Sequence, residues 1–242
     1  MTDFVQLWLY LSSTPLFGLT ATLLAYVLAH QVYVWVDQAP WANPVLWSVV
    51  CLASGLQLSG VAYPTYFSGA QFIHFLLGPA VVALGWPLWQ RRHELRRHGW
   101  RLGLAASAGG AAAALSAAAM AWGMGLSRDT LWSLVPKSVT APVAMGVAEA
   151  IGGIPALAAV FAVVTGMVGA LSARALFTLM GLGESDVDWR IRGFALGTAA
   201  HGIGAARALA VHPDAGAYAG LALGLQVLLA SVWIPLVARA WF

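Results

Sequence analysis

Charged residues are scarce in this chain of 242 residues, where they make up 9% of the sequence while hydrophobic residues make up 60%. A soluble domain carries about 25% charged residues, because a surface that faces water needs them. The scarcity excludes an ordinary soluble fold and indicates a chain that faces lipid, in line with the mean hydropathy of +0.78. Cysteine is nearly absent too, and Cys51 alone cannot form an intrachain disulfide.

Long apolar runs account for nearly the whole chain. A helix needs about 20 predominantly apolar residues to cross the hydrocarbon core, and six runs meet that length without interruption. Two more runs are interrupted by proline, glycine or ionisable residues. The runs do not alternate as barrel strands would, so we predict an all-α polytopic membrane protein with seven or eight membrane elements. The uninterrupted runs are 15–36, 44–62, 72–89, 102–125, 154–180 and 217–242, and the interrupted ones are 131–153 and 193–211.

The arginines indicate how the chain is oriented. Five of them lie in the polar stretch 90–101 between two apolar runs, where the positive-inside rule accounts for them without nucleic-acid binding. We therefore expect that stretch to be cytoplasmic. If the run 131–153 dips into the membrane and returns, seven spans result and four later arginines are cytoplasmic as well; if it spans, they lie outside. The charge rule favours re-entry. These later arginines are Arg174, Arg190, Arg192 and Arg239.

The two halves of the chain, 1–126 and 127–242, would each hold four elements. An Asn-Pro or Ile-Pro pair opens one run in each half, at Pro44 and Pro155, and the next run is broken near its middle, at 78–79 and at 202–204. With one element re-entrant, the second half would be inverted relative to the first, which is typical of transporters. Chance similarity between helices rich in Ala, Leu and Val accounts for the pattern equally well.

Lys137 is the only lysine, and it lies inside an apolar run between Pro136 and Pro142. A lysine at the centre of a membrane costs on the order of 2.5–3.5 kcal/mol, so an intramembrane lysine indicates function. The two prolines should open the helix and expose backbone groups beside Ser138 and Thr140. An ammonium with two hydroxyls suits a carboxylate ligand. The alternative is that Lys137 extends its amine to the membrane interface.

A second group of polar residues surrounds His201, within a run of small residues that permits a break in the helix. Histidine changes charge near neutral pH, so His201 is a candidate for proton coupling, with Glu149 as the other candidate. The alternatives are a histidine hydrogen-bonded between packed helices and a glutamate exposed at the end of its element. Arg207 could bind a carboxylate in bidentate fashion or lie at the interface. The predicted substrate-binding residues are Lys137, Ser138, Thr140, Thr198, His201, Gly202, Gly204 and Arg207.

Other kinds of site have little support. The sequence contains no cluster with metal-ligand spacing, and the acidic loop 184–188 is better explained as solvated than as a calcium site. Ser138 has no histidine and acid arranged around it, so we predict neither an enzyme nor a bound cofactor.

Several motifs resemble the LrgB/CidB family. They are PKSVTAPVAM at 136–145, GGIP at 152–155, LGTAAHGIGAARAL at 196–209 and, in the first half, LLGPAVVAL at 76–84. The resemblance runs from about residue 14 to the C-terminus. It departs from the usual pattern at Ala141, where threonine is common, and at Ala199 and Ala200, where serines are common.

The resemblance implies a multi-pass protein of the bacterial cytoplasmic (inner) membrane. The family carries two functional labels. One is transport of small monocarboxylates such as pyruvate, glycolate and glycerate, and the other is antiholin-like control of murein hydrolase export and autolysis. We expect the first, with a small carboxylate as substrate and membrane lipid around the protein. A separate small LrgA/CidA-like membrane protein is the implied partner, and a homo-oligomer is expected.

Overall fold

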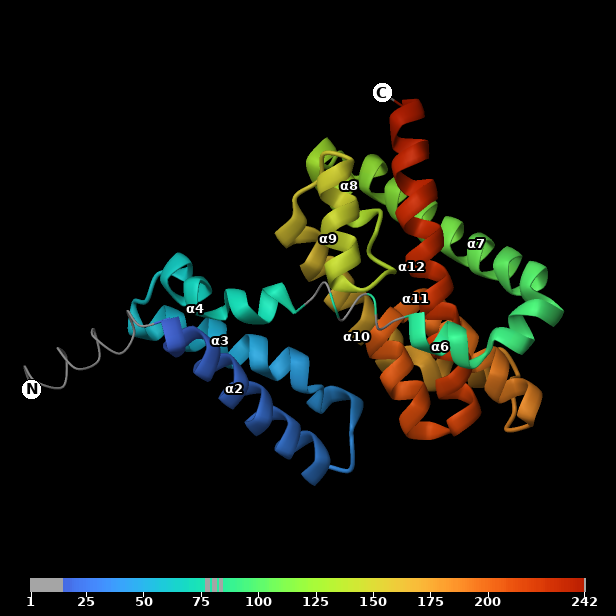
Figure 1. The fold of residues 1–242 in the computed structure, drawn as a ribbon, viewed down its shortest axis with the longest axis horizontal. Helices are drawn as coiled ribbons and strands as arrows, with labels where there is room; N and C mark the ends of the chain where they lie inside the picture. The colour runs from blue at the N-terminus through green and yellow to red at the C-terminus, as the bar shows by residue number, and fades with distance from the viewer. Residues whose placement is uncertain (1–14, 77–78, 80–81, 83–84, 242) are drawn as a thin grey trace, which may run out of the picture. The chain divides into compact units, whose positions relative to one another are not determined.

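The computed structural model describes residues 15–76, 79, 82 and 85–241, and over these ranges the regular structure is entirely helical (Figure 1). Five helices of the described residues are long and apolar enough to cross a membrane, and shorter apolar helices accompany them. The predicted polytopic all-α membrane protein is confirmed at this level. The chain forms two compact units, Met1–Ala80 and Val81–Phe242.

The first unit contains helices that pack closely around α2. Gly18 of α2 lies against α4, because a Cβ added there would stand 2.8 Å from the backbone nitrogen of Ala70. Asn43 caps α3, since its side chain accepts hydrogen bonds from the two following free backbone N–H groups. The predicted break at 78–79 falls partly outside the described residues. The helices are α2 (Pro15–Trp35), η1 (Pro40–Ala42), α3 (Pro44–Ser59) and α4 (Tyr63–Phe75).

The second unit contains the remaining helices. They are α6 (Gly85–Gln90), α7 (Arg92–Gly123), α8 (Arg128–Leu134), α9 (Ala141–Ala150), α10 (Pro155–Leu179), α11 (Asp186–Val211) and α12 (Pro213–Trp241).

Two boundaries differ from the sequence-based prediction. The stretch 90–101 is not a loop, because α7 starts at Arg92 and continues for 32 residues. At a rise of 1.5 Å per residue this helix is about 48 Å long, so it extends well beyond a hydrocarbon core of about 30 Å. The run 44–62 forms only the 16 residues of α3, because Gly60 adopts a left-handed conformation that ends the helix.

Helices α8 and α9 form a hairpin. After α8 the backbone passes through tight turns as far as Thr140, and Pro142 then helps to start α9. The end of the hairpin lies against α8, because the backbone N–H of Ile154 donates to Ser133 Oγ at 2.7 Å. Figure 1 shows this hairpin beside the C-terminal half of α12, with α10 starting next to it.

Helix α11 is a second hairpin. His201 has φ 40° and ψ −133°, which is not helical. A Cβ on Gly204 would stand 2.8 Å from the carbonyl oxygen of Leu196, although eight residues of straight helix would separate them by about 12 Å. The rings of Trp189 and His212 stack at 4.9 Å, where a straight helix would hold them about 34 Å apart. The arms 186–200 and 202–211 therefore lie side by side.

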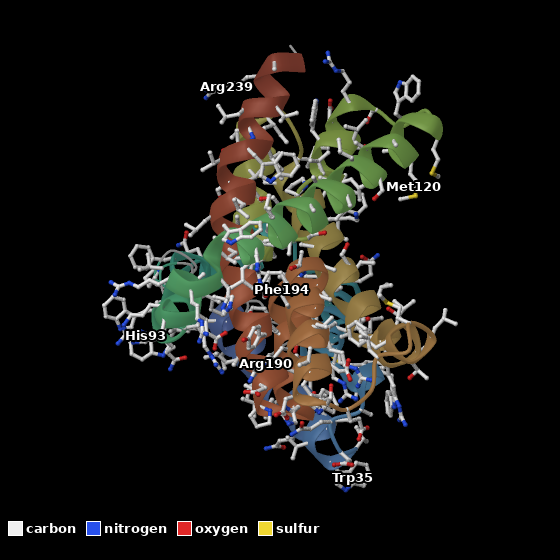
Figure 2. The ribbon with its side chains drawn as sticks, turned by 90° about the vertical axis from the view of Figure 1, so that its right-hand side faces the viewer. Trp35, His93, Met120, Arg190, Phe194 and Arg239 are labelled. Carbon is white, nitrogen blue, oxygen red and sulfur yellow. The ribbon has the colours of Figure 1, made fainter. Side chains whose placement is uncertain are left out.

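The reversal in α11 corrects one predicted placement. Figure 2 shows His93 and Arg190 in the lower half of the second unit, and Met120 and Arg239 in the upper half. The seven-span interpretation placed Arg239 with Arg190 on the cytoplasmic side. The structure instead places these two arginines toward opposite ends of the unit, because α11 folds back on itself before α12 starts.

Candidate functional site

The tips of the two hairpins meet at the middle of α7. Lys137, in the turn of the α8–α9 hairpin, donates from Nζ to the carbonyl oxygen of Ala113 at 3.0 Å. Thr198, just before the turn of α11, places its methyl group 2.8 Å from where a Cβ on Gly109 would stand. Residues 109 and 113 are about one helical turn apart, so the two tips are neighbours.

Small residues on α7 permit this approach. A stripe of alanine and glycine faces inward along the helix, and it is buried. Gly110 leaves room for the amide of Gln226, since a Cβ there would stand 2.6 Å from Oε1. Small residues let elements approach closely within a membrane, where packing rather than the hydrophobic effect holds helices together. The buried stripe is Ala106, Gly110, Ala114, Ala117 and Ala121.

Lys137 brings a positive charge to the meeting point. Its side chain is partly buried, and among the described residues no carboxylate lies within 4 Å of its amine. An ammonium has three donors, and the carbonyl of Ala113 takes one of them. Two donors and an unpaired charge are therefore left for an anionic ligand.

Two hydroxyl-bearing residues, Ser138 and Thr140, follow Lys137 in the same turn. Ser138 is 8% exposed, and the hydroxyl of Thr140 is buried without a hydrogen-bond partner in the described part of the chain. Buried polar groups are nearly always hydrogen-bonded, so an orphan hydroxyl calls for a functional explanation. Together the turn offers an ammonium and hydroxyls, which are the donors that a small hydroxy or oxo acid needs.

His201 fixes the second tip to α10. Its ring is 3% exposed, and Nε2 lies 2.7 Å from the carbonyl oxygen of Ala162. A carbonyl only accepts, so Nε2 carries the hydrogen in this contact. The ring occupies space left free by Gly166, where a Cβ would stand 2.9 Å from two ring atoms. The observed geometry is thus that of a histidine hydrogen-bonded between packed helices, and its part in proton transfer stays a prediction.

Of the other residues predicted to bind substrate or carry a proton, some lie at the tip of the α11 hairpin and others lie away from it. Thr198 is buried, but its hydroxyl donates to the carbonyl of Phe194 in its own helix at 2.8 Å. Gly204 allows the sharp reversal, while an added Cβ on Gly202 would meet no heavy atom of the other described residues within 4 Å. Arg207 lies six residues past the break, about 9 Å along its arm. Glu149 is exposed near the end of α9. The structure does not bring either charge to Lys137.

Gln226 is a polar residue near the site that sequence reasoning missed. It lies on α12, is 1% exposed, and donates from Nε2 to the carbonyl of Ala106 at 2.6 Å. This carbonyl is two helical turns from that of Ala113, on the same side of α7. Gln226 is the only polar side chain in the run 219–230, and that isolation was the available signal.

The open end of the α11 hairpin carries a cluster of charged and aromatic side chains. Asp214 lies 3.8 Å from both Arg190 and Arg91, and Arg91 also pairs with Glu94 at 2.6 Å. These side chains are partly exposed, so each pair contributes at most about 1 kcal/mol. Together they connect the first turns of α12 with α11 and with the start of α7.

Comparison with known proteins gives one consistent family. The model of the LrgB-like family matches residues 22–240. A Bacillus subtilis protein described as uncharacterized protein YxaC is 33% identical over 204 residues, covering 82% of this chain and 84% of its own. The holin-like protein CidB of Staphylococcus epidermidis is 28% identical over 203 residues, covering 84% and 87%. No solved structure matches this chain.

Proposed function

Because this chain belongs to the LrgB-like family of multi-pass membrane proteins, we propose that it is a secondary transporter of small monocarboxylates of the glycolate, glycerate and pyruvate class. One observation carries the proposal. Two helical hairpins with their open ends at opposite ends of the second unit meet at the middle of α7, and the only lysine of the chain lies at that meeting point.

We interpret both hairpins as re-entrant, so that each enters the membrane and returns on the same side. Non-helical backbone at membrane depth is tolerated where protein or a polar cavity surrounds it, and broken helices at the midplane are how many transporters bind their substrates. Opposed hairpins also supply two gates, one toward each side of the membrane. Movement of one hairpin at a time would give alternating access to a fixed site.

Electrostatics favour an anionic substrate. The second arm of each hairpin starts at the tip, at Ala141 in α9 and at Gly202 in α11, so two helix N-termini face the meeting point. The positive end of a helix dipole attracts anions. Lys137 adds one full charge, which matches a single carboxylate, and the hydroxyls of Ser138 and Thr140 suit a neighbouring hydroxyl or oxo group.

Proton coupling forms part of the proposal. His201 is the first candidate because it lies at the second tip, and Glu149 is the second. An LrgA/CidA-like small membrane protein would be a partner that modulates transport, and we expect the transporter to form a homo-oligomer.

A second candidate function is antiholin-like regulation of murein hydrolase export and autolysis. The description of the CidB relatives as holin-like proteins favours this candidate more directly than it favours transport. A regulator needs interaction surfaces and no substrate path of its own. It would leave the unpaired ammonium of Lys137 and the orphan hydroxyl of Thr140 without a role.

Uptake into proteoliposomes distinguishes the two candidates. Purified protein would be reconstituted and given labelled glycolate, glycerate and pyruvate in turn, with protein-free liposomes as the control. We expect saturable uptake of at least one of them, faster when the external solution is acidified. Uptake of all three at the rate of the protein-free liposomes would reject the transport proposal and favour regulation.

A further inference from the structure

The first third of α7 presents an exposed basic face. Four arginines of this segment are exposed, and they spread over about half of the helix circumference. Leu95, Gly99 and Leu102 occupy the opposite, less exposed side. The exposed arginines are Arg92, Arg96, Arg97 and Arg101, and the exposed side chains of His93 and Trp100 lie among them.

This face has no acidic counterpart in the described part of the chain. Glu94, the only carboxylate of the segment, is partly buried and bound to Arg91 at 2.6 Å. None of the four exposed arginines forms an ion pair with a described residue. Arg92 and Arg101 lie over the rings of Trp89 and Trp100, at 4.7 Å and 5.4 Å from the centroids. The positive charge of the face is thus available to a partner from outside the chain.

The position of the face along α7 identifies that partner. The same helix continues without a break into the apolar segment that ends at Gly123, so the arginines lie where the segment leaves the hydrocarbon core. Tryptophans prefer this boundary, and anionic headgroups attract juxtamembrane basic clusters there. Phosphate is also the group that a guanidinium binds best, through two parallel hydrogen bonds.

We propose that the exposed arginines of α7, Arg92, Arg96, Arg97 and Arg101, form a binding surface for the phosphate groups of anionic phospholipids. The surface is independent of the hairpin tips, and it is compatible with either function considered above. It holds the N-terminal part of α7 against the membrane surface and fixes the depth of the helix in the bilayer.

The test uses the full-length protein in phosphatidylcholine vesicles that contain traces of spin-labelled phosphatidylglycerol or spin-labelled phosphatidylcholine. Electron spin resonance measures the fraction of each lipid held at the protein. We expect the wild type to bind phosphatidylglycerol in preference to phosphatidylcholine. This preference should be at least about fivefold smaller in the variant Arg92→Gln/Arg96→Gln/Arg97→Gln/Arg101→Gln. The same four positions changed to lysine should keep most of it, because the charge remains.

Arg239→Gln is the matched control, since it removes an exposed arginine from the other end of the unit. It should leave the preference unchanged. If the fourfold glutamine variant does not reconstitute, two double variants replace it, Arg92→Gln/Arg96→Gln and Arg97→Gln/Arg101→Gln. Each should lose a smaller part of the preference for phosphatidylglycerol. An unchanged preference in the glutamine variants, or an equal loss in Arg239→Gln, would overturn the proposal.

Discussion

At the scale of single residues, the contact between Gly166 and His201 supports the reversal of α11. A methyl group on Gly166 would stand 2.9 Å from the imidazole, and the ring cannot move freely because it is bound to the carbonyl of Ala162. We expect Gly166→Ala to lower the stability by about 1–3 kcal/mol through overpacking. Thermal melting of the detergent-purified protein measures this. Gly146→Ala is the control, since no other element of the described chain lies within 4 Å of its added Cβ. An equal loss of stability in both variants would contradict the role of the contact.

His201 also permits a residue-scale test of proton coupling. Asparagine tolerates a positive φ better than most residues and has no titrating group near neutrality, so His201→Asn removes the charge change with little added backbone strain. If His201 carries the proton, uptake by this variant should no longer respond to an inward pH gradient. Uptake at several gradients, with Glu149→Gln in parallel, is the measurement. An unaltered gradient response in His201→Asn would assign the proton to another group.

At the scale of elements, the hairpin form of α11 sets the distance between its ends. Ile191 and Val211 are twenty residues apart, which is about 30 Å in a straight helix. In the hairpin they lie near the stacked rings of Trp189 and His212. With Cys51 replaced by serine, spin labels at Ile191→Cys and Val211→Cys should give a distance below about 20 Å by double electron–electron resonance. A narrow distribution near 30 Å would mean a continuous helix.

The sequence predicted that both interrupted runs would break, but not how far each would turn. Pro136 and Pro142 mark the first turn, and the residues around His201 mark the second. A glycine-rich stretch permits a break without setting its angle. The angle in α11 comes from tertiary packing, in which Gly193 and Gly197 lie against Ala215 and Ala219 of α12. Gln226 was missed for a related reason, since its bond to Ala106 joins residues 120 positions apart.

At the scale of the whole molecule, the second unit has two ends that should lie on opposite sides of the membrane. The end with Arg190 and His93 carries most of the arginines, so it should be cytoplasmic. In a background with Cys51→Ser, a cysteine at His98 should resist an impermeant thiol reagent added to intact cells, while one at Ala240 should react. Equal protection of both would contradict the single crossing by α12.

The central claim is that the meeting point of the hairpins binds a carboxylate through Lys137, and uptake by Lys137→Met tests it most directly. Methionine keeps an unbranched chain of similar length, so the fold should survive and melting should occur at the wild-type temperature or above. Loss of a charged hydrogen bond of about 1.5–3 kcal/mol should lower substrate uptake about 10- to 100-fold. Lys137→Arg should be partly active at best, because a planar fork does not replace a compact ammonium. Arg239→Met, which removes an exposed charge, should transport normally. Wild-type uptake by a folded Lys137→Met variant would contradict the account.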